Sequence, residues 1–126
     1  MTSIDYFVGF TSEPKDIDDF LGSAGFGFRS KDACGDMHYG NKESVFVVYT
    51  PADSFIESDY WTNVFKCSPP ICAIARVEPM YECSNANALK IAVKIQAKYQ
   101  GSMLGQRNPD SNRFSVSAID SQKKHS

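Results

Sequence analysis

Four cysteines and two histidines are the side chains of this chain best suited to metal binding or nucleophilic catalysis. Cys34 and His38 form a C-x3-H pair in the segment CGDMHYG, and Cys67 and Cys72 form a C-x4-C pair around SPPI. Structural zinc sites usually combine tighter pairs, such as C-x2-C, with a matching second pair. These spacings therefore do not predict a metal site, and we expect no metal and no cofactor.

Catalysis by a thiol would require a cysteine close to a histidine that acts as its base. His38 is the one candidate base, because His125 lies at the end of the chain. No sequence feature marks a cysteine as activated, and the glycine-rich segment GSAGFGF lacks the G-x-x-x-x-G-K-[S/T] pattern of phosphate-binding loops. We therefore expect no catalytic residues. A small enzyme that pairs a cysteine with His38 is the alternative.

The charged side chains are distributed unevenly along the chain. Residues 1–60 hold 11 acidic and 4 basic groups, a net charge of −7, whereas residues 61–126 hold 4 acidic and 9 basic groups, a net charge of +5. A negative field of this size can steer a basic partner toward the acidic half. The alternative is that the two halves interleave in space and the field cancels.

Acidic and aromatic side chains are concentrated in the segment 53–61. Trp and Tyr are frequent anchors of protein interfaces, and flanking carboxylates suit a basic partner. This composition favours a protein–protein contact, and the alternative is a set of core aromatic residues beside a solvated acidic edge. The residues concerned are Asp53, Phe55, Glu57, Asp59, Tyr60 and Trp61.

The elements that must position these groups follow from hydrophobic pattern and turn residues. We expect a long loop over 23–43 with one irregular strand at GFGFR, a short helix or covering loop over 52–66, and a turn-rich loop over 101–112. A helix over 11–22 is expected to begin at Thr11 or Ser12, with acidic residues near its N-terminus. The predicted strands cover 3–10, 44–50, 71–79 and 113–119.

The segment SNANALKIAVKIQAKYQG, residues 84–101, has the clearest helical pattern. Its apolar residues cover an arc of about 200° on a helical wheel, wider than the ~100° of an ordinary surface helix. Ser84 can cap the helix and Gly101 can end it in the left-handed conformation. Gln96 falls within the apolar arc and needs a hydrogen-bond partner if it is buried. The exposed ridge consists of Lys90, Lys94 and Lys98.

These elements predict one α+β domain over 1–126, with a globular core over 1–120 and a disordered tail over 121–126. We expect a single antiparallel or mixed sheet of about four strands with two main helices on one face. A ferredoxin-like arrangement is one candidate.

The opening segment MTSIDYFVGF carries neither a basic region nor an apolar core of the signal-peptide type. No apolar run approaches the ~20 residues that span a bilayer. We therefore expect a cytoplasmic protein with reduced thiols and no membrane partner. The alternative is an exported protein in which Cys67 and Cys72 form a disulfide.

The late segment ALKIAVKIQAKYQGSML, preceded by a strand containing IARVEP, carries a family resemblance. An alanine-rich helix that ends in an aromatic-x-Gly stop after such a strand resembles the C-terminal part of several immunity proteins. These proteins belong to bacterial polymorphic toxin, contact-dependent inhibition and type VI secretion systems. The resemblance covers about a third of the chain, and it carries over no functional residue.

The resemblance implies a non-catalytic protein that binds one cognate toxin domain, often a nuclease, and covers its active site. Nucleases are commonly basic because they hold phosphates, so an acidic inhibitor suits them. A nucleic-acid-binding module that uses the lysine ridge is a further alternative, which the isoelectric point of 5.6 disfavours. The partner-binding residues that this hypothesis implies are Asp16, Asp18, Asp19, Asp53, Glu57, Asp59, Tyr60 and Trp61.

Overall fold

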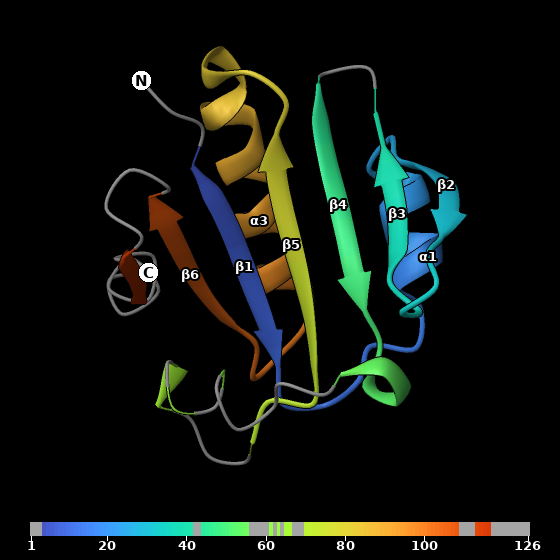
Figure 1. Ribbon diagram of the computed structural model, residues 1–126, viewed down its shortest axis with the longest axis vertical. Helices are drawn as coiled ribbons and strands as arrows, with labels where there is room; N and C mark the ends of the chain where they lie inside the picture. The colour runs from blue at the N-terminus through green and yellow to red at the C-terminus, as the bar shows by residue number, and fades with distance from the viewer. Residues whose placement is uncertain are drawn as a thin grey trace.

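The strands of this protein form a single sheet in the order β2-β3-β4-β5-β1-β6-β7 (Figure 1). The computed structural model describes residues 4–41, 44–55, 61, 63, 65, 66, 70–108 and 113–116; for residues 82, 108 and 113–116 it describes only the backbone. The strands are β1 (Asp5–Phe10), β2 (Gly27–Lys31), β3 (Met37–Gly40), β4 (Val45–Thr50), β5 (Ala73–Pro79), β6 (Met103–Asn108) and β7 (Arg113–Val116). The helices are α1 (Ile17–Ser23) and α3 (Asn85–Lys98), with short 3-10 turns η1 (Ala52–Ser54) and η2 (Glu82–Ser84).

The predicted α+β class is confirmed, and so is an antiparallel sheet carrying two main helices. Every described pair of neighbouring strands is antiparallel. The predicted size of about four strands is wrong, because the sheet contains seven. The ferredoxin-like arrangement is also wrong, since that fold follows a four-strand β-α-β-β-α-β order. The predicted tail, 121–126, lies outside the described residues.

The extra strands come from segments that were predicted as loops. β2 and β3 form a hairpin within 23–43, where only an irregular strand at GFGFR was expected, and β2 does carry a register shift between Phe28 and Ser30. β6 lies within the predicted loop 101–112 and pairs with β1 along its length. Neither β3 nor β6 has a run of β-branched residues, so pairing with a neighbouring strand outweighs their weak local preference.

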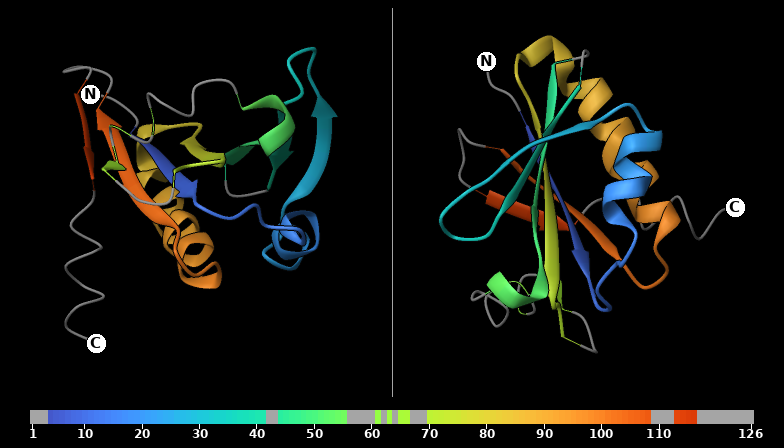
Figure 2. Two further views of the ribbon diagram at one scale, coloured as in Figure 1. Left: turned by 90° about the horizontal axis from the view of Figure 1, so that it is seen from below. Right: turned by 90° about the vertical axis from the view of Figure 1, so that its right-hand side faces the viewer.

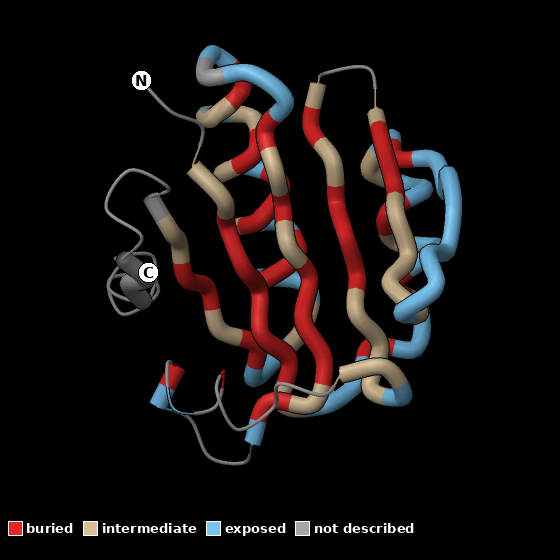
Figure 3. Tube along the Cα trace, viewed as in Figure 1, coloured by how far each residue is buried: buried red, intermediate tan, exposed pale blue. Residues whose placement is uncertain are grey.

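Both helices cover the same face of the sheet, as the two views of Figure 2 show. Residues of β1, β4, β5 and β6 on this face pack with both helices in one buried cluster. Val8, Phe10, Leu21 and Ile95 are each completely buried there. Burial follows the central strands and the inner side of α3 in Figure 3.

α3 matches the pattern predicted for it. Lys90, Lys94 and Lys98 are exposed, while Gln96 is buried and donates a hydrogen bond to the carbonyl oxygen of Ser102 at 3.1 Å. Gly101 has a positive φ of 81°, as expected for the residue that ends the helical segment. No helix within the described residues is long and apolar enough to cross a membrane.

α1 begins later than predicted. Its N-cap is Asp16 rather than Thr11 or Ser12, and Asp18 and Asp19 occupy the first turn. The preceding residues are held in a different conformation because the Glu13 carboxylate accepts a hydrogen bond from the backbone N–H of Ala52 at 2.8 Å. The acidic residues nevertheless lie near the positive end of the helix dipole, as predicted.

The opposite face of the sheet is covered in part by a second apolar cluster. Phe7 of β1 packs against Trp61 with ring centroids 5.0 Å apart, and Phe65 and Ile71 pack beside them. Gly9 permits this packing because a Cβ atom there would lie 2.8 Å from Cδ1 of Ile71 and 3.0 Å from the Phe65 ring. Within the segment 52–66, η1 is a 3-10 turn and residues 61, 63 and 65 are helical.

Candidate functional site

Four segments that are distant in the sequence meet at one end of the molecule. They are residues 11–16, the turn 32–36, η1, and the chain that follows α3 (Figure 1). The hydroxyl of Thr11 donates to the carbonyl oxygen of Gly101, and Gly35 lies directly against Ser54. With the adjacent α1, these segments carry the seven carboxylates that we call the acidic end: Glu13, Asp16, Asp18, Asp19, Asp32, Asp36 and Asp53.

Glu13 joins the first of these segments to η1. One carboxylate oxygen accepts hydrogen bonds from the backbone N–H of Ala52 at 2.8 Å and from the Tyr49 hydroxyl at 3.5 Å. Burial, and secondly the Glu13 charge, raises the pKa of Tyr49. Tyr49 therefore remains a neutral donor that fixes the Glu13 carboxylate in place.

Asp16 joins α1 to the end of α3. The Tyr99 hydroxyl donates a hydrogen bond to its carboxylate at 2.8 Å, and Lys98 Nζ lies 3.5 Å from the other oxygen. The Tyr99 hydrogen bond is the largest cause that lowers the pKa of Asp16 below its ordinary value, and Lys98 adds to it. Asp16 therefore stays ionised to lower pH than an ordinary aspartate.

Asp32 organises the turn between β2 and β3. Its Oδ1 accepts hydrogen bonds from the backbone N–H groups of Cys34 (2.9 Å) and Asp36 (3.0 Å), and its Oδ2 lies 2.9 Å from His38 Nε2. The His38 contact is the largest cause that lowers the pKa of Asp32. In turn, Asp36 accepts a hydrogen bond from the Thr50 hydroxyl at 2.9 Å, which holds the turn against β4.

The structure brings together four of the eight residues predicted to bind a partner. Asp16, Asp18, Asp19 and Asp53 are exposed at or beside the acidic end. Asp18 also accepts a hydrogen bond from the Tyr39 hydroxyl at 3.0 Å. The predictions for Glu57, Asp59 and Tyr60 lie outside the described residues.

Trp61 differs from the exposed anchor that was expected. Its side chain is only 7% exposed and packs between Phe7 and Phe65, with centroids 5.0 and 6.0 Å away. Packing against the sheet removes more of the indole ring from water than a position at the rim of an interface would, and burial of this large apolar surface is favourable. Of the two interpretations of this aromatic segment, the core interpretation holds for Trp61.

Apart from Lys98, which pairs with Asp16, the charges of the two halves are largely segregated within the described part of the chain. β1, from the acidic half, lies between β5 and β6, but its one charged residue, Asp5, pairs with Arg107 at 3.5 Å. The other described carboxylates of residues 1–60 are those of the acidic end. Between positions 11 and 55 the described residues include the seven carboxylates of the acidic end and three basic side chains, Lys15, Arg29 and Lys31. The net charge of this part of the chain is therefore −4.

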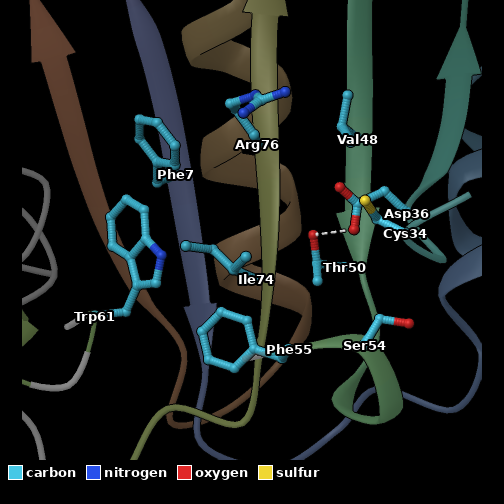
Figure 4. A pocket seen from close by; sticks show the side chains of 10 residues that line it. All are labelled: Phe7, Cys34, Asp36, Val48, Thr50, Ser54, Phe55, Trp61, Ile74 and Arg76. Carbon is cyan, nitrogen blue, oxygen red and sulfur yellow. Dashed lines mark hydrogen bonds between the residues drawn. The ribbon is translucent and has the colours of Figure 1, made fainter. Parts of the chain in front are cut away.

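A pocket of about 220 Å³ lies next to the acidic end, on the face of the sheet opposite the helices (Figure 4). Its apolar wall is formed by Phe7, Val48, Phe55, Trp61 and Ile74, and its polar lining by Cys34, Asp36, Thr50, Ser54 and Arg76. The turn 32–36 and η1 thus contribute to both the acidic end and the pocket rim.

Among the described residues that line the pocket, Arg76 is the one cationic side chain. Its Nε lies 2.7 Å from a carboxylate oxygen of Glu78, but the N–H group is not directed at that oxygen and makes no hydrogen bond. The side chain is 39% exposed, so the guanidinium is reachable from solvent. The pocket therefore presents hydrogen-bond donors beside an aromatic and aliphatic wall.

Sequence reasoning missed Arg76, Asp36 and Thr50 as site residues. The usable signal for Arg76 was a charged residue in the middle of the apolar strand ICAIARVEP. A charge at such a position must reach solvent or a partner, because burying it alone is costly. No comparable signal marks Asp36, which reaches the pocket through the β2–β3 turn.

The alternative of a cysteine–histidine enzyme gains no support from the described residues. His38 Nε2 faces the Asp32 carboxylate, and the Cys34 thiol makes no hydrogen bond with the described part of the chain. Cys34, Cys72 and Cys83 are free thiols, and Cys67 lies outside the described residues. Among the residues that the structure describes, no three potential metal ligands gather.

Comparisons of the chain with models of protein families, with curated proteins and with solved structures find no match. The functional interpretation therefore rests on the residues and contacts of this chain alone.

Proposed function

We propose that this protein is a non-catalytic binding protein whose acidic end recognises a basic protein partner. In this proposal the partner is a bacterial toxin domain, such as a nuclease, which the protein neutralises in the cytoplasm by covering its active site. The observation that carries the proposal is that separate segments bring seven carboxylates to one part of the molecule, with those of α1 on the helix-covered side of the sheet and those of the turn 32–36 on the other side (Figure 2).

The internal contacts of the acidic end favour binding. Glu13, Asp16, Asp18, Asp32 and Asp36 each accept at least one hydrogen bond from elsewhere in the chain. Groups that are already fixed lose little conformational entropy when a partner binds, so they contribute more to affinity. Exposed Asp19 and Asp53 add charge that accelerates association with a basic surface.

A nuclease is the class of toxin that this surface suits best. A nuclease holds the phosphates of its substrate with basic side chains. Carboxylates presented by a rigid protein surface can occupy that basic groove and exclude the nucleic acid. The lysine ridge of α3 gives less support to a nucleic-acid-binding function, because Lys98 is paired with Asp16.

The first test of this proposal is protection of growing cells. We expect the gene beside this one to encode a protein that ends in a basic toxin domain. Expression of that domain alone should stop bacterial growth, and co-expression of this protein should restore it. A neighbouring metabolic operon, or a toxin domain whose effect persists during co-expression, would refute the immunity proposal.

A further inference from the structure

The pocket on the open face of the sheet combines opposite charges with an apolar wall. In Figure 4 Arg76 stands near the middle of the pocket, Asp36 lies on one side of it, Phe7 and Trp61 lie on the other side, and Ile74 lies below it. At about 220 Å³ the pocket is smaller than the roughly 300–1,000 Å³ typical of sites for drug-sized ligands. Its size therefore suits a compact metabolite.

Arg76 supplies the anion-binding edge of the pocket. Its Nε forms an ion pair with Glu78 at 2.7 Å, whereas its terminal guanidinium nitrogens make no hydrogen bond with the described residues. A guanidinium presents paired donors that match the two oxygens of a carboxylate. The position thus fits the carboxylate group of a ligand.

Asp36 supplies the opposite edge. One carboxylate oxygen is occupied by the Thr50 hydroxyl at 2.9 Å, which fixes the orientation of the group. The other oxygen has no hydrogen-bond donor among the described residues. A positioned carboxylate with a vacant acceptor is suited to an ammonium group.

The sheet register brings these two groups to the same pocket. Arg76 pairs across the strands with Val48, and Thr50, which holds Asp36, is two residues further along β4 on the same face. Both charged side chains therefore line one small pocket. An α-amino acid bears its carboxylate and ammonium on one carbon, so a single compact ligand carries both of the groups that Arg76 and Asp36 can bind.

We propose that this pocket binds a free α-amino acid with an apolar or aromatic side chain. The ligand carboxylate contacts Arg76, its ammonium contacts Asp36, and its side chain lies on the wall formed by Phe7, Trp61 and Ile74. The pocket shares Asp36 and the neighbouring η1 with the acidic end, but the inference concerns a different ligand and does not depend on the toxin proposal.

The test is calorimetric titration of the full chain with four ligands: L-phenylalanine, L-leucine, 3-phenylpropionate and phenethylamine. The last two lack the ammonium and the carboxylate respectively. We expect L-phenylalanine or L-leucine to bind, and the two truncated ligands to bind at least ~10-fold more weakly, because each leaves one charged group without its partner. Absence of binding by both amino acids at millimolar concentration would overturn the proposal. So would equal binding of the amino acid and 3-phenylpropionate.

Two substitutions locate the site. Arg76→Met and Asp36→Asn should each weaken binding of the amino acid by at least ~10-fold. Asp36→Asn keeps an oxygen that can accept from Thr50, so it alters the charge with little change in shape. Arg29→Met and Asp19→Asn make the same chemical changes outside the pocket and should leave binding unchanged. Equal effects of the pocket variants and these controls would overturn the assignment, and a matching thermal unfolding midpoint for each variant excludes loss of fold.

Discussion

At two exposed carboxylates of the acidic end, Asp16 and Asp32, a side-chain hydrogen bond is the largest cause of a lowered pKa. The Asp16 side chain is half-exposed to solvent, yet the Tyr99 hydroxyl holds its pKa below the ordinary value. Its folded pKa is lowered, so its contribution to stability is complete above the ordinary pKa of about 4 and is lost as the pH falls through the folded value.

Tyr99→Phe removes the largest cause of this shift. We expect the pKa of Asp16 in the folded protein, measured by NMR titration of its carboxyl carbon, to rise toward the ordinary value. The loss of stability below pH about 4 should become shallower in the same variant. Tyr81→Phe is the matched control, because Tyr81 is 57% exposed and its hydroxyl makes no hydrogen bond with the described residues. An unchanged Asp16 pKa in Tyr99→Phe would contradict the assignment.

Gly9 is a second residue whose effect depends on one contact. A Cβ atom there would enter the packing of Ile71 and Phe65 over β1. We expect Gly9→Ala to lower the free energy of unfolding by about 1–3 kcal/mol through overpacking. Gly22→Ala, in α1 with no atom within 4 Å of the new methyl group, should be neutral or stabilising by up to about 1 kcal/mol. If Gly9→Ala and the wild-type protein were equally stable in urea denaturation, Ile71 and Phe65 would have to rearrange without cost to accommodate the new methyl group.

Residue roles were predictable from the sequence only where they depend on local pattern. The exposed lysine ridge, buried Gln96 and the positive φ of Gly101 follow from the periodicity and ending of one helix. The buried position of Trp61 and the pocket positions of Arg76 and Asp36 depend on strands and turns brought together from distant segments. Such contacts leave no periodic signal in the sequence.

At the scale of elements, the junction between α3 and β6 is set by a reciprocal pair of buried hydrogen bonds. Gln96 Nε2 donates to the carbonyl oxygen of Ser102, and the Ser102 hydroxyl is shared between the carbonyl oxygens of Tyr99 at 2.6 Å and Gln96 at 3.0 Å. This pair fixes where the chain leaves the helix and enters β6. It also explains why an amide is buried in an otherwise apolar stripe.

Gln96→Met tests this junction with a side chain of similar length. The variant leaves a buried carbonyl oxygen without its donor, so we expect the free energy of unfolding to fall by about 1–3 kcal/mol. Gln100→Met places the same change at an exposed position and should alter stability by less than about 0.5 kcal/mol. Chemical denaturation of both variants gives the comparison, and a small effect at Gln96 would assign the junction to apolar packing alone.

Element prediction succeeded for strands with a strong apolar pattern and failed for those stabilised by their neighbours. β1, β4 and β5 are central, and their sequences are rich in Val, Ile, Phe and Tyr. β6, with the sequence MLGQRN, carries no such preference and becomes a strand through its pairing with β1. Because segments that were predicted as loops form strands, the described residues make a sheet of seven strands where about four were expected.

At the scale of the whole molecule, the chain order separates charge. The one strand that passes from the acidic half into the basic half, β1, carries almost no charge of its own. The remaining described carboxylates of the acidic half are therefore left together beside η1 and α1. This layout is the physical basis for long-range attraction of a basic partner.

The most direct test of the central claim is the salt dependence of binding to the basic toxin domain encoded beside this gene. For the wild-type protein we expect affinity to fall steeply as salt rises. The double variant Asp19→Lys with Asp53→Lys should bind more weakly at low salt and show a flatter dependence. Both residues are exposed and make no hydrogen bond or ion pair with the described residues, although Asp19→Lys opposes the helix dipole by about 0.3–1 kcal/mol.

Glu82→Lys, in η2 at the opposite end of the sheet, reverses one charge, as each of the two substitutions does, and serves as the control for a single charge reversal. The account predicts that this variant binds with nearly the wild-type affinity and salt dependence. Equal affinities for the wild-type protein, the double variant and the control at every salt concentration would contradict recognition through the acidic end.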